Sequence, residues 1–354
     1  MSSILYYITG HGFGHAVRSN QVIRALKKAA PWLDIHVRTT APEWLFKNSS
    51  HPVSHTRRVL DVGIIQPNSL ELDLEQTLRA CRELHLGMKE LVREEIAFVD
   101  HNQIDLIVGD IPPVCFEIAA RAKLPSVAIS NFTWDFIYTA YANAHREFLP
   151  LIDEMKGFYQ KASLALTLPY PCGMRVFPNR RSIPWISRAS QLTKAQARAA
   201  FRLPPAATIV LLSFGGIGLN SLPWNRFLAL EDYFFVATGP TEVSQRNVLV
   251  LADAQQHYED LLRAVDVVVT KPGYGIVADV LSHQIPILYT DRGEFPEYSR
   301  LVQALTECAT ADYIPQSELL AGRIAPYLER LISKQANWPK VELDGAQVAS
   351  QSIL

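Results

Sequence analysis

The chain has 354 residues, 48% of them hydrophobic, and its 34 lysines and arginines nearly balance its 35 aspartates and glutamates. This length exceeds what one hydrophobic core usually supports, so we expect two domains. The balanced charge gives neither a basic surface for nucleic acid nor an acidic tail, and it argues against a nucleic-acid partner.

Four cysteines are far apart in the sequence, at positions 81, 115, 172 and 308, without any C-x-x-C spacing. This pattern argues against a zinc site or a disulfide framework and fits a reducing cytoplasm. The N-terminus has no basic segment followed by a long apolar one, and no window approaches the roughly 18 to 20 apolar residues of a spanning helix. We expect a cytoplasmic protein and leave peripheral membrane association open.

The first motif is "ILYYITGHGFGHAVRSNQVIRAL", residues 4–26. An apolar run meets a turn with three glycines and two histidines, and apolar residues then recur at helical spacing, which predicts strand, turn and helix. Glycines in a turn that opens a helix are typical of phosphate binding. The histidines instead suggest proton transfer.

Further strands are predicted within residues 33–40, 103–113 and 124–134, with a helical stretch over 74–98. This alternation is typical of a parallel, doubly wound sheet. Residues 170–190 contain several prolines and little periodicity, so we interpret them as the crossing between domains.

The same plan restarts at residues 206–220, where an apolar strand again runs into a glycine turn. More strands are expected within 232–239, 246–254, 264–275 and 285–291, with a helix over 275–283. We therefore predict two Rossmann-like α/β domains, 1–185 and 186–336, and a helix in 337–354 that packs back on the first. Their sheets should face a cleft, because open parallel sheets bind ligands at the carboxyl ends of their strands.

In the second half, Lys271, Gly273, Tyr274 and Gly275 separate a β-branched strand from a helix. The glycines let backbone N–H groups approach a diphosphate, which the helix N-terminus and Lys271 also favour. Asp279, one helical turn on, could accept hydrogen bonds from ribose hydroxyls. A plain tight turn with a solvated aspartate remains the alternative.

A second small-residue turn, Ser213-Phe214-Gly215-Gly216, follows the first strand of this half. Two such loops at strand ends can hold a diphosphate between them, whereas a structural turn needs only one glycine. Glu294 and Glu297 follow another strand end, where they would contact sugar hydroxyls or remain surface charges.

In the first half, His15 closes the glycine turn at a helix start, where the helix dipole keeps imidazole neutral. A neutral histidine can act as a general base when a carboxylate accepts its other N–H. Asp110, at the end of the strand "DLIVGD", is the best candidate for that carboxylate. A purely structural histidine is the alternative.

Together these motifs resemble the two-domain glycosyltransferases of the GT-B fold, in particular the group with the N-acetylglucosaminyl transferase of peptidoglycan synthesis and the plant galactolipid synthases. The stretches "YYITGHGFGHAVRSNQVIRAL" and "GYGIVADVLSHQIPILYTDR" look still more like the glycosyltransferase-like amino-terminal domain of plant L-arabinokinases. The resemblance covers nearly the whole chain. Since no sugar-kinase domain follows, it implies a standalone glycosyltransferase-like protein.

The resemblance also implies roles for individual residues. His15 and Asp110 take the positions of the catalytic histidine and its carboxylate, and Asp279 stands where the family's ribose-binding residue is usually a glutamate. The implied donor-site residues are Ser213, Phe214, Gly215, Gly216, Lys271, Gly273, Tyr274, Gly275, Asp279, Glu294 and Glu297. On the acceptor side we place His11, Gly12, Phe13, Gly14, Arg18 and Trp134.

The implied reaction transfers a hexose-type sugar from a nucleoside diphosphate sugar, with uridine as the usual base of the relatives, to an acceptor hydroxyl on a glycan, a lipid or a small molecule. His15 removes the acceptor proton, and the family outcome is inversion. No D-x-D motif is present, so we expect neither a metal nor another cofactor.

Three other functions stay open at this stage. An NAD-dependent oxidoreductase is disfavoured because His15 falls where the fingerprint needs a third small residue, and no acidic residue ends the second strand. A nucleotide-sugar epimerase or hydrolase would use the same donor pocket. A non-catalytic module that binds a nucleotide-sugar would share the fold.

Overall fold

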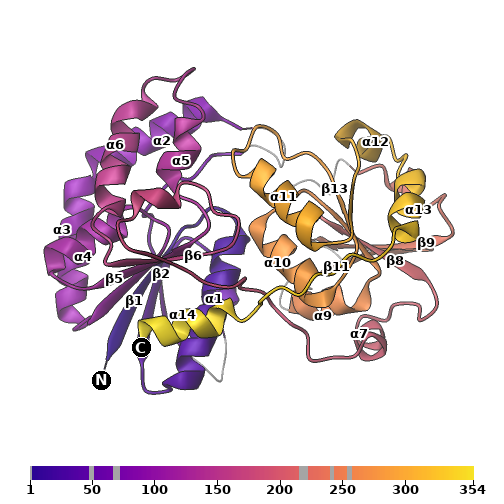
Figure 1. Ribbon diagram of the computed structural model, residues 1–354, viewed down its shortest axis with the longest axis horizontal. Coiled ribbons are helices and arrows are strands. Elements are labelled where there is room, and N and C mark those ends of the chain that lie inside the picture. The colour runs from indigo at the N-terminus through magenta and orange to yellow at the C-terminus, as the bar shows by residue number, and fades with distance from the viewer. Residues whose placement is uncertain (1, 48–51, 67–71, 215–221, 240–242, 253–256) are drawn as a thin grey trace. The chain divides into compact units, whose positions relative to one another are not determined.

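The computed structural model describes residues 2–47, 52–66, 72–214, 222–239, 243–252 and 257–354. The chain forms two compact units (Figure 1). The first unit contains residues 1–66, 72–186 and 342–354, and the second contains residues 187–341.

The first unit is built on a parallel sheet of seven strands in the order β3-β2-β1-β4-β5-β6-β7. Its strands are β1 (Ser3–Ile8), β2 (Asp34–Thr39), β3 (Ser54–Arg57), β4 (Leu106–Asp110), β5 (Ser126–Ser130), β6 (Leu164–Thr167) and β7 (Arg180–Ser182). Its helices are α1 (Phe13–Ala29), η1 (Glu43–Phe46), α2 (Leu74–Leu86), α3 (Met88–His101), α4 (Val114–Ala122), α5 (Trp134–Thr139), α6 (Phe148–Tyr159), η2 (Met174–Val176) and α14 (Gly345–Ile353).

The second unit repeats this plan with a seven-stranded sheet in the order β10-β11-β9-β8-β12-β13-β14, in which β10 alone is antiparallel to its neighbour. Its strands are β8 (Thr208–Ser213), β9 (Tyr233–Gly239), β10 (Val243–Gln245), β11 (Val248–Ala252), β12 (Val267–Thr270), β13 (Ile287–Tyr289) and β14 (Ala311–Tyr313). Its helices are α7 (Lys194–Ala200), α8 (Trp224–Phe227), α9 (Tyr258–Ala264), α10 (Tyr274–His283), α11 (Tyr298–Cys308), α12 (Gln316–Leu320) and α13 (Ala325–Ser333).

The predicted α/β class with two mainly parallel sheets is confirmed. The central strands β1 and β12 are mainly apolar, and every one of their residues is buried. Strands of this kind form where helices cover both faces of a parallel sheet. The carboxyl ends of β1 and β4 lie side by side, since Ile8 pairs with Asp110.

Two details of the predicted layout are wrong. The helical stretch over 74–98 is interrupted at Gly87, which ends α2 and begins α3. The proline-rich segment 170–190 is not wholly a crossing, because it contains η2 and the edge strand β7. The three residues of β7 are all exposed, so they carry no hydrophobic signal that would have revealed a strand.

The C-terminal helix α14 packs against α1 within the first unit. The chain that leads into it is bound to the end of the same unit, where Trp185 N–H donates to the Glu342 carbonyl and Gly345 N–H donates to the Trp185 carbonyl. Gly345 is required by close approach: a Cβ there would lie 2.2 Å from the carbonyl oxygen of Pro184. None of the described helices has the length and apolar character that crossing a bilayer requires.

We expect Gly345→Ala to destabilise the first unit by about 1–3 kcal/mol, because the added methyl group forces backbone to move. Urea unfolding followed by circular dichroism measures this change. Gly157→Ala in α6 is the matched control, since the space around its Cβ is open and alanine favours a helix by about 0.5–1 kcal/mol. Equal stability changes in the two variants would contradict this account of the α14 junction.

Candidate active site

The glycine turn joins β1 to α1 and places His15 in the first turn of the helix. Gly12 has a φ of 73°, which favours glycine, and a Cβ on Gly10 would overlap the Thr40 hydroxyl. Gly12, Phe13 and Gly14 are exposed, and no described side chain caps the helix start. The positive end of the α1 dipole therefore acts on the His15 imidazole.

His15 and Asp110 lie in hydrogen-bonding contact, with 2.8 Å between His15 Nδ1 and Asp110 Oδ1. The pairing of β1 with β4 explains the contact, since it places the end of β4 beside the turn that begins α1. Asp110 is completely buried and His15 is 8% exposed. Burial opposes the ionisation of Asp110, but Arg18 and His15 outweigh it and hold the pKa of this carboxyl well below its usual range.

Arg18 was placed on the acceptor side, and contact with an acceptor stays a prediction, but the structure shows another set of partners for it. The residue is 4% exposed, and its guanidinium donates to Asp110, Asn131 and Ser130. Because it lies one helical turn after His15, it shares the helix face that covers the end of β4. Arg18 is thus part of the buried cluster around Asp110.

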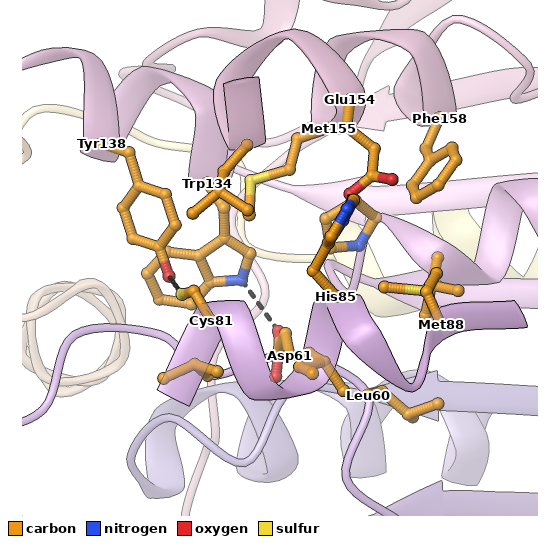
Figure 2. Close-up of a pocket in the computed structure, with 15 residues that line it drawn as sticks. Leu60, Asp61, Cys81, His85, Met88, Trp134, Tyr138, Glu154, Met155 and Phe158 are labelled. Carbon is orange, nitrogen blue, oxygen red and sulfur yellow. Dashed lines mark hydrogen bonds and ion pairs between the residues drawn. The ribbon is translucent and has the colours of Figure 1, made fainter. Parts of the chain in front are cut away.

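Trp134 was also placed on the acceptor side; its ring is fully buried in the structure, and contact with an acceptor stays a prediction. Figure 2 shows its indole pointing at Asp61, to whose Oδ2 the Nε1–H donates over 2.8 Å. The ring forms one wall of a pocket of about 30 Å³ in the first unit, which has room for one or two water molecules. Burial raises the pKa of Asp61 to about 6.

His11 and Phe13 lie nearer the surface of the same turn. The His11 ring makes an edge contact with Trp134, with 5.2 Å between centroids, and packs against Gly63. Phe13 is 41% exposed and makes an edge contact with Trp44. Contact of His11, Gly12, Phe13 and Gly14 with an acceptor stays a prediction.

In the second unit, the predicted donor residues Ser213, Phe214 and Lys271 lie at the carboxyl ends of β8 and β12. These strands are paired, with Thr270 opposite Ser213, and Ser213 Oγ lies 2.5 Å from the Tyr258 hydroxyl. Phe214 is buried, whereas Gly215 and Gly216 lie outside the described residues.

Helix α10 begins at this edge, with Gly273 as its N-cap and with Tyr274 and Gly275 in its first turn. No described side chain caps this helix start, and the space where a Cβ of Gly273 would lie is open. Lys271 directly follows β12. Burial and the nearby Arg292 lower the pKa of Lys271 to about 8. An anion at this helix start would meet backbone N–H groups and two cationic side chains.

Asp279 is 2% exposed and already has a partner in Arg188. Its Oδ1 accepts from the Arg188 backbone N–H, and its Oδ2 accepts from the guanidinium Nε and Nη2 at 3.0 and 2.5 Å. A carboxylate offers about four acceptor sites, so these three bonds leave little capacity for ribose. The role of Asp279 in ribose binding stays a prediction.

The two acidic residues after β13 have different surroundings. Glu294 is exposed, and its contact with a sugar stays a prediction. Glu297 is 2% exposed and accepts a 2.9 Å hydrogen bond from Arg292, whose guanidinium lies over the Phe295 ring. Glu297 is therefore not a plain surface charge, because it is paired with Arg292, and its contact with a sugar stays a prediction.

Sequence reasoning did not assign Arg188 or Arg292 to the site, nor Ser19 and Asn131 to the Asp110 cluster. Ser19 follows His15 by four residues, so helical spacing would have found it. Asn131 comes directly after β5, next to β4, and Arg292 comes shortly after β13, so their places at strand ends were a usable signal. Arg188 gave no such signal, because its contact with Asp279 joins residues 91 positions apart.

Among the described residues, no group of three or more histidine, cysteine, aspartate and glutamate side chains is gathered as a metal site would require.

Comparisons with known proteins agree with this architecture. Residues 2–153 match the family described as Glycosyl transferase family 1. The chain is 31% identical over 358 residues to an L-arabinokinase of Arabidopsis thaliana, an alignment that covers 98% of this chain. The chain spans about a third of the length of that relative.

Solved structures that are similar to this chain include glycosyltransferases. The calicheamicin glycosyltransferase CalG4 has a TM-score of 0.63 at 13% identity, covering 99% of this chain and 93% of that one. MurG of Acinetobacter baumannii has a TM-score of 0.55 at 12% identity, covering 100% and 99%. UGT89C1 of Arabidopsis thaliana, in complex with UDP, has a TM-score of 0.59 at 14% identity, covering 99% and 94%. The predicted GT-B fold and the resemblance to its glycosyltransferases are confirmed.

We expect Asp110→Asn to lower the free energy of unfolding by about 3–5 kcal/mol at pH 7, because it leaves the buried Arg18 charge without its counterion. Since the pKa of Asp110 is depressed in the folded state, its stabilising effect is present above the unfolded value of about 4 and is lost as the pH falls below it. Urea unfolding of the wild type and of Asp110→Asn between pH 7 and pH 3 measures this loss. The difference in unfolding free energy between the two proteins should become smaller only at the acid end of this range. Asp34→Asn, at a half-exposed side chain, is the control, and a similar loss there would contradict the prediction.

Proposed function

We propose, from the glycosyltransferase fold of the whole chain, that this protein transfers a hexose-type sugar from a nucleoside diphosphate sugar to an acceptor hydroxyl. The observation that carries the proposal is the 2.8 Å contact of His15 with a buried, ionised Asp110 at the uncapped start of α1. Uridine is the base we favour, because a structural neighbour binds UDP.

The proposed chemistry begins with the acceptor hydroxyl. His15 Nε2 takes its proton as the oxygen forms a bond with the anomeric carbon of the donor, while the bond from that carbon to the diphosphate oxygen breaks. Asp110 accepts the Nδ1–H, orients the ring and stabilises the imidazolium that forms. Attack opposite the leaving group inverts the anomeric centre.

The leaving nucleoside diphosphate gains negative charge in this step. In the second unit, the start of α10, Lys271 and Arg292 provide backbone N–H groups and positive charge at one edge of the sheet. Fixed donors of this kind stabilise developing charge without reorganising. We therefore propose that departure of the leaving group needs no metal ion or other cofactor.

The acceptor is a hydroxyl compound that we leave at the level of a glycan, a lipid or a small molecule. A structural neighbour, UGT89C1, is seen in complex with quercetin, a small molecule with hydroxyl groups. The cytoplasm, suggested by the cysteine usage, is the compartment we propose.

The experiment that tests the function combines a thermal-shift screen of nucleoside diphosphates and their sugars with mass spectrometry of reactions that contain acceptor mixtures. A ligand that binds only the folded state raises the melting temperature. Sugar attached to an acceptor would support transfer, whereas epimerised sugar, free sugar or binding without turnover would contradict it. ATP with L-arabinose forms a further arm, and phosphorylation of the arabinose would also contradict the proposal.

His15→Ala should lower the transfer rate by about 10²–10⁴-fold, since it removes a general base. It should leave UDP affinity, measured by calorimetry, nearly unchanged, because the candidate diphosphate site belongs to the second unit. His36→Ala, outside the site, is the matched control. If UDP binding collapsed in the His15 variant, the residue would be a phosphate ligand and not the base.

The affinity for UDP should be nearly constant around pH 7 and fall as the pH rises above about 8. The reason is that Lys271 then loses its proton in the empty protein, and binding of the diphosphate must restore it, at a cost of up to about tenfold per pH unit. Isothermal titration calorimetry between pH 7 and pH 9 measures this dependence. Lys271→Met should bind UDP more weakly and lose the pH dependence, and a variant that kept it would disprove the role of Lys271.

A further inference from the structure

Arg18 makes more hydrogen bonds to the His15 site than a packing role requires. Its Nε and Nη2 donate to the two oxygens of Asp110 at 2.7 and 2.5 Å. The planar guanidinium therefore binds the carboxylate in a bidentate manner, through two parallel hydrogen bonds. Its Nη1 donates to Asn131 Oδ1 at 2.6 Å, and Nη2 also donates to Ser130 Oγ at 3.2 Å. The Arg18 side chain thus connects α1, where it begins, to the ends of β4 and β5 through hydrogen bonds.

These contacts saturate the Asp110 carboxylate. Oδ1 accepts from Arg18 and from His15 Nδ1, while Oδ2 accepts from Arg18 and from the Ser19 hydroxyl at 2.8 Å. A carboxylate has about four lone-pair positions, and all four are used here. Asp110 therefore stays ionised and accepts hydrogen bonds, but it does not accept a proton.

The same contacts select the tautomer of His15. The ionised Asp110 can only accept, so its 2.8 Å contact with His15 Nδ1 calls for a hydrogen on that nitrogen. Arg18 Nη2 lies 2.9 Å from the same nitrogen and has Asp110 Oδ1 and Ser130 Oγ as acceptors for its two hydrogens. His15 Nδ1 must then carry the hydrogen that it shares with Asp110. The lone pair of the neutral ring lies on Nε2, which is the nitrogen that a general base uses.

We propose that Arg18 is a positioning residue of the active site, which cancels the charge of Asp110 and thereby keeps the His15 base neutral and in its Nδ1–H tautomer. The proposal rests on the proposed function of His15 as the base. Without Arg18, the buried carboxylate would face His15 with an uncompensated negative charge, and the imidazole would hold a proton more tightly.

The other charged and titratable groups near this cluster fit the same assignment. Asp61, from the segment after β3, adds a second carboxyl near Asp110. Burial raises the pKa of Tyr6 on β1 far above its usual value, so this residue stays neutral. Arg18 therefore supplies the positive charge that balances Asp110 in the described surroundings of His15, assisted by the dipole of α1.

The test is an NMR titration of the His15 ring in the full chain, assigned with His15→Gln, in wild type and in Arg18→Met. The protonation midpoint should rise by at least about one pH unit in Arg18→Met, a tenfold change in the protonation equilibrium. Arg18→Lys, which keeps the charge, should remain near wild type. Arg38→Met, which breaks the buried Arg38–Glu95 pair elsewhere in the unit, should not move the midpoint.

The rate profile gives a second readout. The acid limb of kcat/KM should move to higher pH in Arg18→Met and return towards wild type in Arg18→Lys, whereas a merely structural arginine would lower the rate equally at all pH values. A His15 midpoint that shifts by less than about 0.3 unit in a folded Arg18→Met protein overturns the proposal.

Two outcomes are kept apart by this design, because the ring titration does not need turnover. If His15 titrates as expected but no transfer occurs, the proposed function fails and the positioning role stands. If Arg18→Met does not fold, the ¹⁵N shifts of wild-type His15 decide alone: a protonated Nδ1 beside an unprotonated Nε2 supports the proposal, and the opposite tautomer overturns it.

Discussion

The first unit depends on one buried carboxylate. Asp110 accepts four hydrogen bonds, all from residues of α1, and the arginine among them reaches on to the segment after β5. An ionised group without exposure is costly unless it is paired and fully hydrogen-bonded, so these partners must be held in place together. The same contacts that make the buried charge tolerable hold His15, the base in our proposal, in position.

The second unit handles charge in a different way. Two of its arginines are paired with carboxylates, Arg188 with Asp279 and Arg292 with Glu297, and each of the two also lies over an aromatic ring. Lys271 is held beside Arg292 at partial burial, a position in which its proton is weakly bound. In our proposal, a diphosphate at the start of α10 would supply the negative charge that Lys271 lacks in the empty protein.

Several features of the fold could be predicted from single stretches of sequence. The apolar run of β1 followed by glycines, and the β-branched run of β12 followed by "KPGYG", each predicted strand, turn and helix, as the structure has them. The break at Gly87 and the polar edge strand β7 could not be predicted, because neither changes the hydrophobic period. His15 and Asp110 could be expected to meet only because parallel neighbouring strands end at the same edge.

The sequence by itself determined the α/β class, the glycine turns and the types of side chain that end the strands, because these depend on period, chirality and residue chemistry over a few neighbours. Only the tertiary structure decided which partner each charged side chain has. Arg18 and Trp134, which the sequence analysis placed on the acceptor side, are buried in the structure. Asp279 forms an ion pair with Arg188. The reason is that a buried charge takes whichever partner packing brings within reach, and that partner can lie anywhere along the chain.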